Sequence, residues 1–126
     1  AGDVDTAAVM LQTASGKICQ ISNSRRATYG YDQRVEVHGS KGMLRADNML
    51  ESSVEVATKD GFRRAPAQHF FLERYSEAYR LEMVHFIEAT KAGVQPSPNI
   101  EDGLKAQMLA DAAATALATG QPQRIA

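Results

Sequence analysis

The hydrophobic pattern of this 126-residue chain changes period near its middle, and that change limits the folds available to it. In the first half, apolar and polar residues alternate, as in residues 34–38 (RVEVH) and 53–58 (SVEVAT), which is the pattern of strands with one buried face. In the second half, apolar residues recur every three to four positions, which is typical of amphipathic helices. The sequence therefore predicts strands first and helices afterwards.

Five strands are predicted in the first 65 residues, and short gaps with turn-forming residues separate most of them. Short gaps join antiparallel neighbours, because parallel neighbours need a crossover of about a dozen residues or more. We therefore expect an antiparallel meander, followed by a last short strand at residues 123–126. The five predicted strands are residues 4–12, 17–23, 34–38, 43–47 and 53–58.

Two helices are predicted in the second half. The first ends at Gly93, and the second follows Pro96, carries Glu101 and Asp102 in its first turn and ends at Gly120; acidic side chains favour a helix N-terminus. We predict an α+β domain, with an open, mostly antiparallel sheet of five or six strands covered by two helices. The apolar stripe of the first helix comprises Leu72, Tyr75, Tyr79, Met83, Phe86, Ile87 and Thr90.

Composition excludes several classes of protein. The chain has 14 Lys and Arg against 15 Asp and Glu, whereas nucleic acids and anionic membranes attract a basic surplus. No apolar run approaches the roughly 18 residues of a membrane span. The single cysteine, Cys19, cannot form an internal disulfide and is predicted to be a small core residue, so a cytoplasmic location is expected. The chain begins at Ala1 without an initiator Met, which suggests a piece of a longer protein.

Two apparent motifs have simpler interpretations. Residues 39–42 (GSKG) match a nucleic-acid G-x-x-G loop, but that loop joins helices and this one joins strands, so we predict a hairpin turn. His38, His69 and His85 match no zinc spacing with Cys19, and no metal is expected. We predict surface or capping roles for His38 and His85, and the role of His69 stays open.

A polar segment between two predicted strands, residues 23–33, carries Tyr29 and Tyr31 on either side of Gly30. In an extended stretch both rings would project from one side, and Gly30 would let another group approach the backbone. Phenol hydroxyls beside polar side chains suit a polyhydroxylated ligand. The alternative is that these rings pack on a neighbouring strand or helix, and the sequence leaves both open. Tyr75 and Tyr79 are predicted to be core residues, with one hydroxyl reaching a cleft.

Four segments resemble the inositol 2-dehydrogenase branch of the glucose-fructose oxidoreductase/inositol dehydrogenase family. They are residues 29–43 (YGYDQRVEVHGSKGM), 71–79 (FLERYSEAY), 98–106 (PNIEDGLKA) and the end of the chain. The resemblance covers essentially the whole chain in order. It implies that residues 1–126 are the C-terminal substrate and oligomerisation domain of a Rossmann-type dehydrogenase. The NAD-binding domain and the catalytic Lys, Asp and His would precede the position that matches Ala1.

The resemblance implies oxidation of a ring hydroxyl of myo-inositol to the ketone, within myo-inositol catabolism, with NAD as hydride acceptor. It places Tyr29, Tyr31 and Tyr75 at the substrate and no catalytic, cofactor-binding or metal residue in this chain. It also implies a cytoplasmic homo-oligomer, a homotetramer associating through the sheet face, and an inactive isolated chain. Two alternatives are a stand-alone ligand-binding or oligomerisation module and a related dehydrogenase acting on another sugar or cyclitol.

Overall fold

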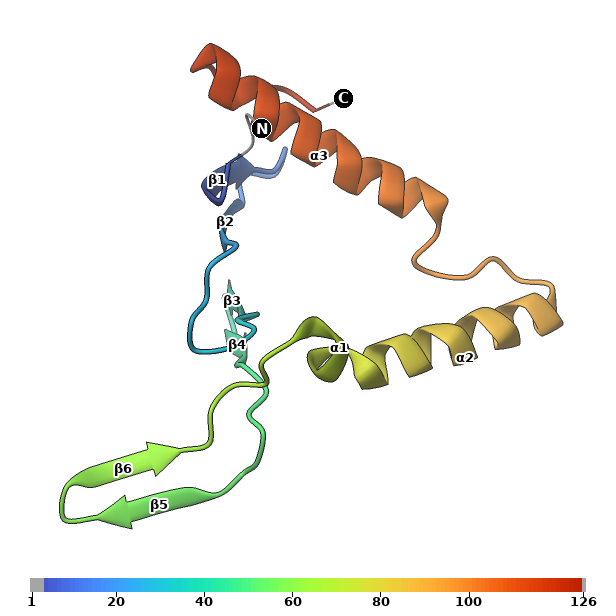
Figure 1. The fold of residues 1–126 in the computed structure, drawn as a ribbon. Coiled ribbons are helices and arrows are strands. Elements are labelled where there is room, and N and C mark those ends of the chain that lie inside the picture. Colours follow the sequence, from blue (N-terminus) through green and yellow to red (C-terminus); the bar gives the residue numbers. More distant parts are fainter. Residues whose placement is uncertain (1–3, 126) are drawn as a thin grey trace. The chain divides into compact units, whose positions relative to one another are not determined.

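The computed structural model describes residues 4–125, and within them strands precede helices along the chain (Figure 1). The order of elements confirms the predicted α+β class. The strands are β1 (Thr6–Gln12), β2 (Ile18–Ser24), β3 (Val35–Gly39), β4 (Gly42–Ala46), β5 (Glu55–Thr58) and β6 (Gly61–Arg64), and the helices are α1 (Phe71–Arg74), α2 (Ser76–Ala92) and α3 (Ile100–Thr119).

The described residues divide into two compact units. Residues 4–7 and 23–81 form the first unit, which contains β3 to β6 and α1. Residues 8–22 and 82–125 form the second unit, which contains α3. All the residues of the candidate functional site belong to the first unit.

Consecutive strands pair as β1–β2, β3–β4 and β5–β6. The β3–β4 and β5–β6 pairs are antiparallel, and Gly39 lies opposite Gly42, so the predicted hairpin turn at residues 39–42 is confirmed. The predicted single sheet of five or six strands is not found, because the described residues form three two-stranded sheets. Each short turn joins two strands that pair, and longer connections at residues 25–34 and 47–54 separate the three pairs along the chain.

The predicted helices are present, with one additional break. The first helical stripe is divided at Tyr75, which separates α1 from α2, although the Tyr75 amide still bonds to Phe71 O at 2.8 Å. Asn99 is the N-cap of α3, and its side chain accepts hydrogen bonds from the amides of Glu101 and Asp102, which is a standard N-cap arrangement. The last predicted strand is wrong for residues 123–125, and residue 126 lies outside the described residues.

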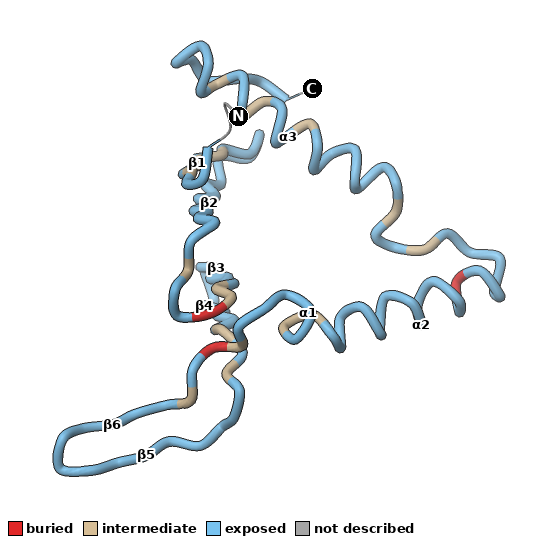
Figure 2. The backbone as a smooth tube through the Cα atoms, in the orientation of Figure 1, coloured by how far each residue is buried: buried red, intermediate tan, exposed pale blue. Residues whose placement is uncertain are grey.

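Most of the described residues are exposed (Figure 2), and they include most of the large apolar ones. Ala67 and Ala89 are the buried hydrophobic residues in this part of the chain, and every residue of β2 to β6 is exposed. The prediction of a buried Cys19 is wrong, since this β2 residue is exposed.

The β3–β4 hairpin, which lies within the first unit, gives the scale of this exposure. Val37 and Leu44 are 54% and 77% exposed. Uncovered apolar surface is unfavourable by about 25 cal/mol per Å². The apolar faces of these strands and helices therefore need further protein surface to cover them. None of the helices within residues 4–125 combines the length and hydropathy that a membrane crossing needs.

The best-defined packing in the first unit lies around Gly30, which is buried and has φ +127°. A Cβ atom at Gly30 would lie 2.9 Å from both Ala67 Cβ and Ala67 O. The Tyr31 amide donates to Gln68 O at 2.8 Å. The prediction that another group approaches the backbone at Gly30 is confirmed, and that group is the chain at residues 67–68. Ala67 also forms a bridge with Leu50.

We expect Gly30→Ala to disrupt this packing, because alanine rarely adopts the positive φ of this position and its methyl group would overlap Ala67. The amide of Tyr31 reports the effect directly, since its exchange with solvent is slowed by the bond to Gln68. We expect exchange at Tyr31 to become at least about tenfold faster, as measured by NMR or mass spectrometry.

Gly42→Ala is the matched control. Gly42 also has a positive φ (+150°), but nothing lies within 4 Å of the position that a Cβ atom would take there. Exchange at Tyr31 should stay within about twofold in this variant. Equal effects of the two substitutions would contradict the close packing of Gly30 on Ala67.

Candidate substrate-binding site

Three tyrosine rings form a row in the first unit. The Tyr31 and Tyr75 ring centroids lie 5.5 Å apart, and those of Tyr75 and Tyr79 lie 6.1 Å apart, both edge to face. This is a favourable arrangement of aromatic rings. Tyr31 follows the close packing at Gly30, and Tyr75 lies at the break between α1 and α2. The structure therefore brings together two of the three residues predicted at the substrate.

The third residue, Tyr29, has different neighbours from Tyr31. Residues 28–30 form a turn and a bend, so the extended stretch assumed for these two tyrosines is wrong. The Tyr29 hydroxyl donates a hydrogen bond to Asp32 Oδ2, while the Tyr31 ring contacts Tyr75. Tyr29 is 59% exposed and Tyr31 is half-buried. Tyr31 thus packs on a residue beside the helices, as the alternative interpretation proposed, and Tyr29 presents its ring to solvent.

Asp32 is held by two different donors. Arg34 Nε donates to Asp32 Oδ1 at 2.8 Å, and Arg34 Nη2 donates to Oδ2 at 2.8 Å; Tyr29 adds its bond to Oδ2. These hydrogen bonds, first from Arg34 and then from Tyr29, lower the pKa of Asp32 to about 2. At neutral pH Asp32 is therefore an anion and a weak base, which makes it unsuited to general-base catalysis.

The two phenols in this region hold their protons more firmly than usual. The pKa of Tyr29 is raised, chiefly because its hydroxyl donates to Asp32. The pKa of Tyr75 is also raised, first by burial and then by its interaction with Tyr31. Both side chains are neutral at pH 7, so each has one O–H donor and oxygen lone pairs for a ligand or a neighbour.

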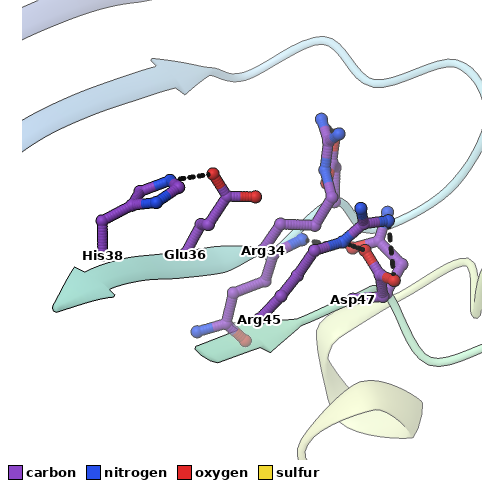
Figure 3. Close-up of polar contacts among 8 residues, drawn as sticks. Arg34, Glu36, His38, Arg45 and Asp47 are labelled. Atoms are coloured by element: carbon purple, nitrogen blue, oxygen red, sulfur yellow. Dashed lines mark hydrogen bonds and ion pairs between the residues drawn. The ribbon is translucent and has the colours of Figure 1, made fainter. Parts of the chain in front are cut away.

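A second arginine–aspartate pair lies close in sequence, at the end of β4. Arg45 Nε and Nη2 donate to the two carboxylate oxygens of Asp47, both at 2.8 Å. Figure 3 shows this pair together with His38, whose Nε2 lies 2.7 Å from Glu36 Oε1. These side chains are largely exposed, and exposed pairs contribute little to stability. The predicted surface role of His38 is confirmed.

The other two histidines, His69 and His85, form hydrogen bonds with nearby residues. His85 is exposed, which confirms the predicted surface role, and its Nε2 accepts a hydrogen bond from the Ser97 amide at 3.1 Å. The His69 amide donates to Glu73 Oε2 at 3.1 Å. No group of three potential metal-ligating side chains occurs among residues 4–125.

Two polar side-chain atoms of the first unit are buried without a hydrogen-bond partner in the part of the chain that the structure describes. They are Gln68 Oε1 and Arg74 Nε. Arg74 also places its guanidinium carbon 5.5 Å from the centre of the Tyr75 ring. An unsatisfied buried polar atom costs about 1–3 kcal/mol. The sequence does not indicate that either atom is buried without a partner, because their positions depend on contacts between segments far apart in the chain.

The comparisons with known proteins agree closely with one another. The model of an oxidoreductase family, C-terminal alpha/beta domain, matches residues 1–125. An inositol 2-dehydrogenase of Rhizobium meliloti is 56% identical over 118 residues, which is 94% of this chain and 36% of the relative. A myo-inositol 2-dehydrogenase of Thermotoga maritima is 49% identical over 117 residues, which is 93% of this chain and 35% of the relative.

The fold agrees with a solved structure as well. A crystal structure from Sinorhizobium meliloti, described as a candidate myo-inositol dehydrogenase, superposes with a TM-score of 0.94 at 54% sequence identity, and the match covers 99% of this chain and 38% of that one. The chain belongs to the glucose-fructose oxidoreductase/inositol dehydrogenase family and corresponds to its C-terminal alpha/beta domain. It spans a little over a third of the length of the curated relatives above.

We expect the carboxyl carbon of Asp32 to titrate by NMR with a midpoint near pH 2, below the usual value of about 3.9. Because the folded-state pKa is the lower one, the stabilisation from its hydrogen bonds is present above about pH 4 and is lost as the pH falls through about 2. Arg34→Gln should move the midpoint upward.

Arg45→Gln is the control for this titration. It should raise the midpoint of Asp47, whose pKa is lowered chiefly by Arg45, and leave that of Asp32 in place. An Asp32 midpoint near 4 in the unsubstituted protein would show that the bonds from Arg34 and Tyr29 do not form in solution.

Proposed function

We propose that the protein to which this chain belongs is an NAD-dependent inositol 2-dehydrogenase, which oxidises a ring hydroxyl of myo-inositol to give 2-keto-inositol. This chain would supply part of the substrate site through Tyr29, Tyr31 and Tyr75. The observation that carries the proposal is the contact between Tyr31 and Tyr75, which joins two segments far apart in the sequence into one aromatic surface. The inositol dehydrogenases among its relatives supply the substrate class.

The chemistry of this surface suits a cyclitol. A ring with a hydroxyl on every carbon has apolar C–H edges that can lie on phenol rings, and its hydroxyls can exchange hydrogen bonds with the phenol oxygens. Aromatic side chains also provide a large contact area while losing little conformational entropy when they become ordered. Holding one C–H bond in a fixed direction lowers the barrier to a reaction at that carbon. We therefore assign this chain a role in binding and orienting the substrate.

NAD does not fit the residues described here. Dinucleotide sites of dehydrogenases use a Gly-rich turn between a strand and a helix of a parallel sheet, whereas β3–β4 and β5–β6 are antiparallel hairpins. The cofactor would bind to a part of the protein outside these 126 residues. We derive no step of the reaction through it, and the chain's own residues would act on the polyol alone.

Association through the strands is part of the same proposal. β3 and β4 present Val35, Val37 and Leu44 with 56%, 54% and 77% of their surface exposed. In the β3–β4 register Val37 lies opposite Leu44, so these residues share one face of the hairpin. A homo-oligomer, proposed as a cytoplasmic tetramer, would cover such a face. This exposed face also favours the alternative of an oligomerisation module without catalysis.

A chimaeric enzyme tests the catalytic proposal. The chain would replace the matching segment of the Rhizobium meliloti inositol 2-dehydrogenase, with which it shares 56% identity. We expect the chimaera to reduce NAD with myo-inositol at a kcat/KM within about tenfold of the unmodified relative, because the tyrosine surface would be retained. Spectrophotometry of NADH formation gives the rate.

The isolated 126-residue chain is the control, and it should reduce no NAD. A panel of inositol isomers and aldoses separates the cyclitol proposal from another sugar substrate. A folded chimaera that binds NAD and oxidises none of them would overturn the proposed function and leave the binding or oligomerisation module in its place.

Tyr31→Phe in the chimaera should lower kcat/KM for myo-inositol roughly tenfold, the value expected for loss of one hydrogen bond. The melting temperature should change little, because phenylalanine keeps the ring contact with Tyr75. Tyr79→Phe removes a hydroxyl from the outer end of the same row and should leave kcat/KM within about twofold. Equal losses in the two variants would argue against a specific role for Tyr31.

A further inference from the structure

The direction of the hydrogen bond at Tyr29 is fixed by its partner. A phenol carries one proton and two acceptor positions, whereas an ionised carboxylate only accepts. The Tyr29 hydroxyl must therefore donate its proton to Asp32 Oδ2. What remains on the Tyr29 oxygen for any other partner is acceptor capacity alone.

Arg34 prevents Asp32 from changing this arrangement. Its planar guanidinium binds both carboxylate oxygens at 2.8 Å, and such two-point pairs hold a carboxylate in one orientation. The Asp32 side chain is only 17% exposed, so little of it is left for a ligand. By contrast, Tyr29 is 59% exposed. A ligand in this region would reach the tyrosine rather than the carboxylate.

We infer that Asp32 and Arg34 are positioning residues that make the Tyr29 oxygen an acceptor, so that it receives a hydrogen bond from a substrate hydroxyl and gives none. This inference rests on the proposed function, since it assumes a polyol at Tyr29. It assigns a specificity role to residues that would not touch the substrate themselves. It also predicts which substrate changes the site tolerates, because only a group with a proton to donate can satisfy Tyr29.

The chain contains a matched pair for comparison. Arg45 and Asp47, shown in Figure 3, repeat the two-point geometry of Arg34 and Asp32, including the spacing of two residues and both 2.8 Å bonds. No tyrosine hydroxyl bonds to Asp47 among the described residues. A substitution at Asp47 therefore removes the same kind of ion pair without changing the hydrogen bond at Tyr29.

Fluorinated substrates test the inference in the chimaeric dehydrogenase. Fluorine in place of a hydroxyl accepts weakly and cannot donate, so a monodeoxyfluoro-inositol removes one donor at a time. At one ring position away from the oxidised carbon, we expect kcat/KM relative to myo-inositol to fall about tenfold. Tyr29→Phe should reduce that loss to within about twofold, since no acceptor remains to be satisfied. For each variant, kcat/KM of the fluorinated substrate is divided by kcat/KM of myo-inositol. Comparing this ratio between variants cancels the effect that fluorine has on the reaction itself.

The substitution Asp32→Asn tests the role of the carboxylate. The amide would keep its oxygen toward Arg34 and turn its NH₂ toward Tyr29, so the tyrosine proton would become available to the ligand. In Asp32→Asn, the fall in kcat/KM caused by fluorine at the sensitive ring position should become severalfold smaller. In Asp47→Asn, this fall in kcat/KM should be unchanged. Asp32→Glu retains a carboxylate and should restore part of the discrimination. Circular dichroism checks that each variant is folded.

Three results would separate the ways in which these ideas can fail. If fluorine lowers kcat/KM by the same factor in the unsubstituted chimaera and in Tyr29→Phe at every ring position, the inference is wrong. Activity on myo-inositol would in that case still support the proposed function. If Asp32→Asn lowers kcat/KM equally for all substrates, Asp32 is a structural residue and the inference is again wrong. If no cyclitol is oxidised, the proposed function itself fails. Should Asp32→Asn not fold, the comparison with Tyr29→Phe still decides whether Tyr29 acts as an acceptor.

Discussion

The first unit depends on the close approach of two backbone segments at Gly30. A side chain there would meet Ala67 at 2.9 Å, so the absence of one allows the Tyr31 amide to reach Gln68 O. Close packing of this kind tolerates little change in volume. Because only a few residues separate Gln68 from Tyr75, this contact also brings the ring of Tyr31 to Tyr75. The tyrosine row is thus a consequence of how one glycine packs.

Two arginine–aspartate ion pairs determine the charge and the hydrogen bonding of the residues that follow Gly30. Two arginine–aspartate pairs with the same spacing and distances lie close together in the sequence, yet of these two carboxylates only Asp32 also accepts from a tyrosine among the described residues. Such a pair contributes little to stability where it is exposed. At Asp32 its effect is instead on hydrogen-bond direction, since a carboxylate held in one orientation determines which way the Tyr29 proton points. The ion pair between Arg34 and Asp32 therefore bears on the hydrogen bonding of Tyr29 as well as on stability.

The uncovered apolar surface explains why some predictions failed. The alternation in β3 and β5 correctly indicated strands with one apolar face, but Val37 and Val56 are exposed, as is Cys19. A period-two pattern shows that a face needs covering and does not identify what covers it. Strand β6 was missed because Phe62 is followed by two arginines, which breaks the alternation. The split at Tyr75 was missed because the apolar stripe continues unchanged through α1 and α2.

The sequence by itself determined five of the six described strands, the turns at glycines, the two helical regions and the family, because each depends on neighbouring residues or on a pattern of residue types along the chain. It also selected Tyr29, Tyr31 and Tyr75 through resemblance. Only the tertiary structure decided that Tyr31 contacts Tyr75 while Tyr29 bonds to Asp32, and that Gln68 Oε1 is buried without a partner in the described residues. These facts depend on the turn at residues 28–30 and on contacts between distant segments, which no periodicity or spacing encodes.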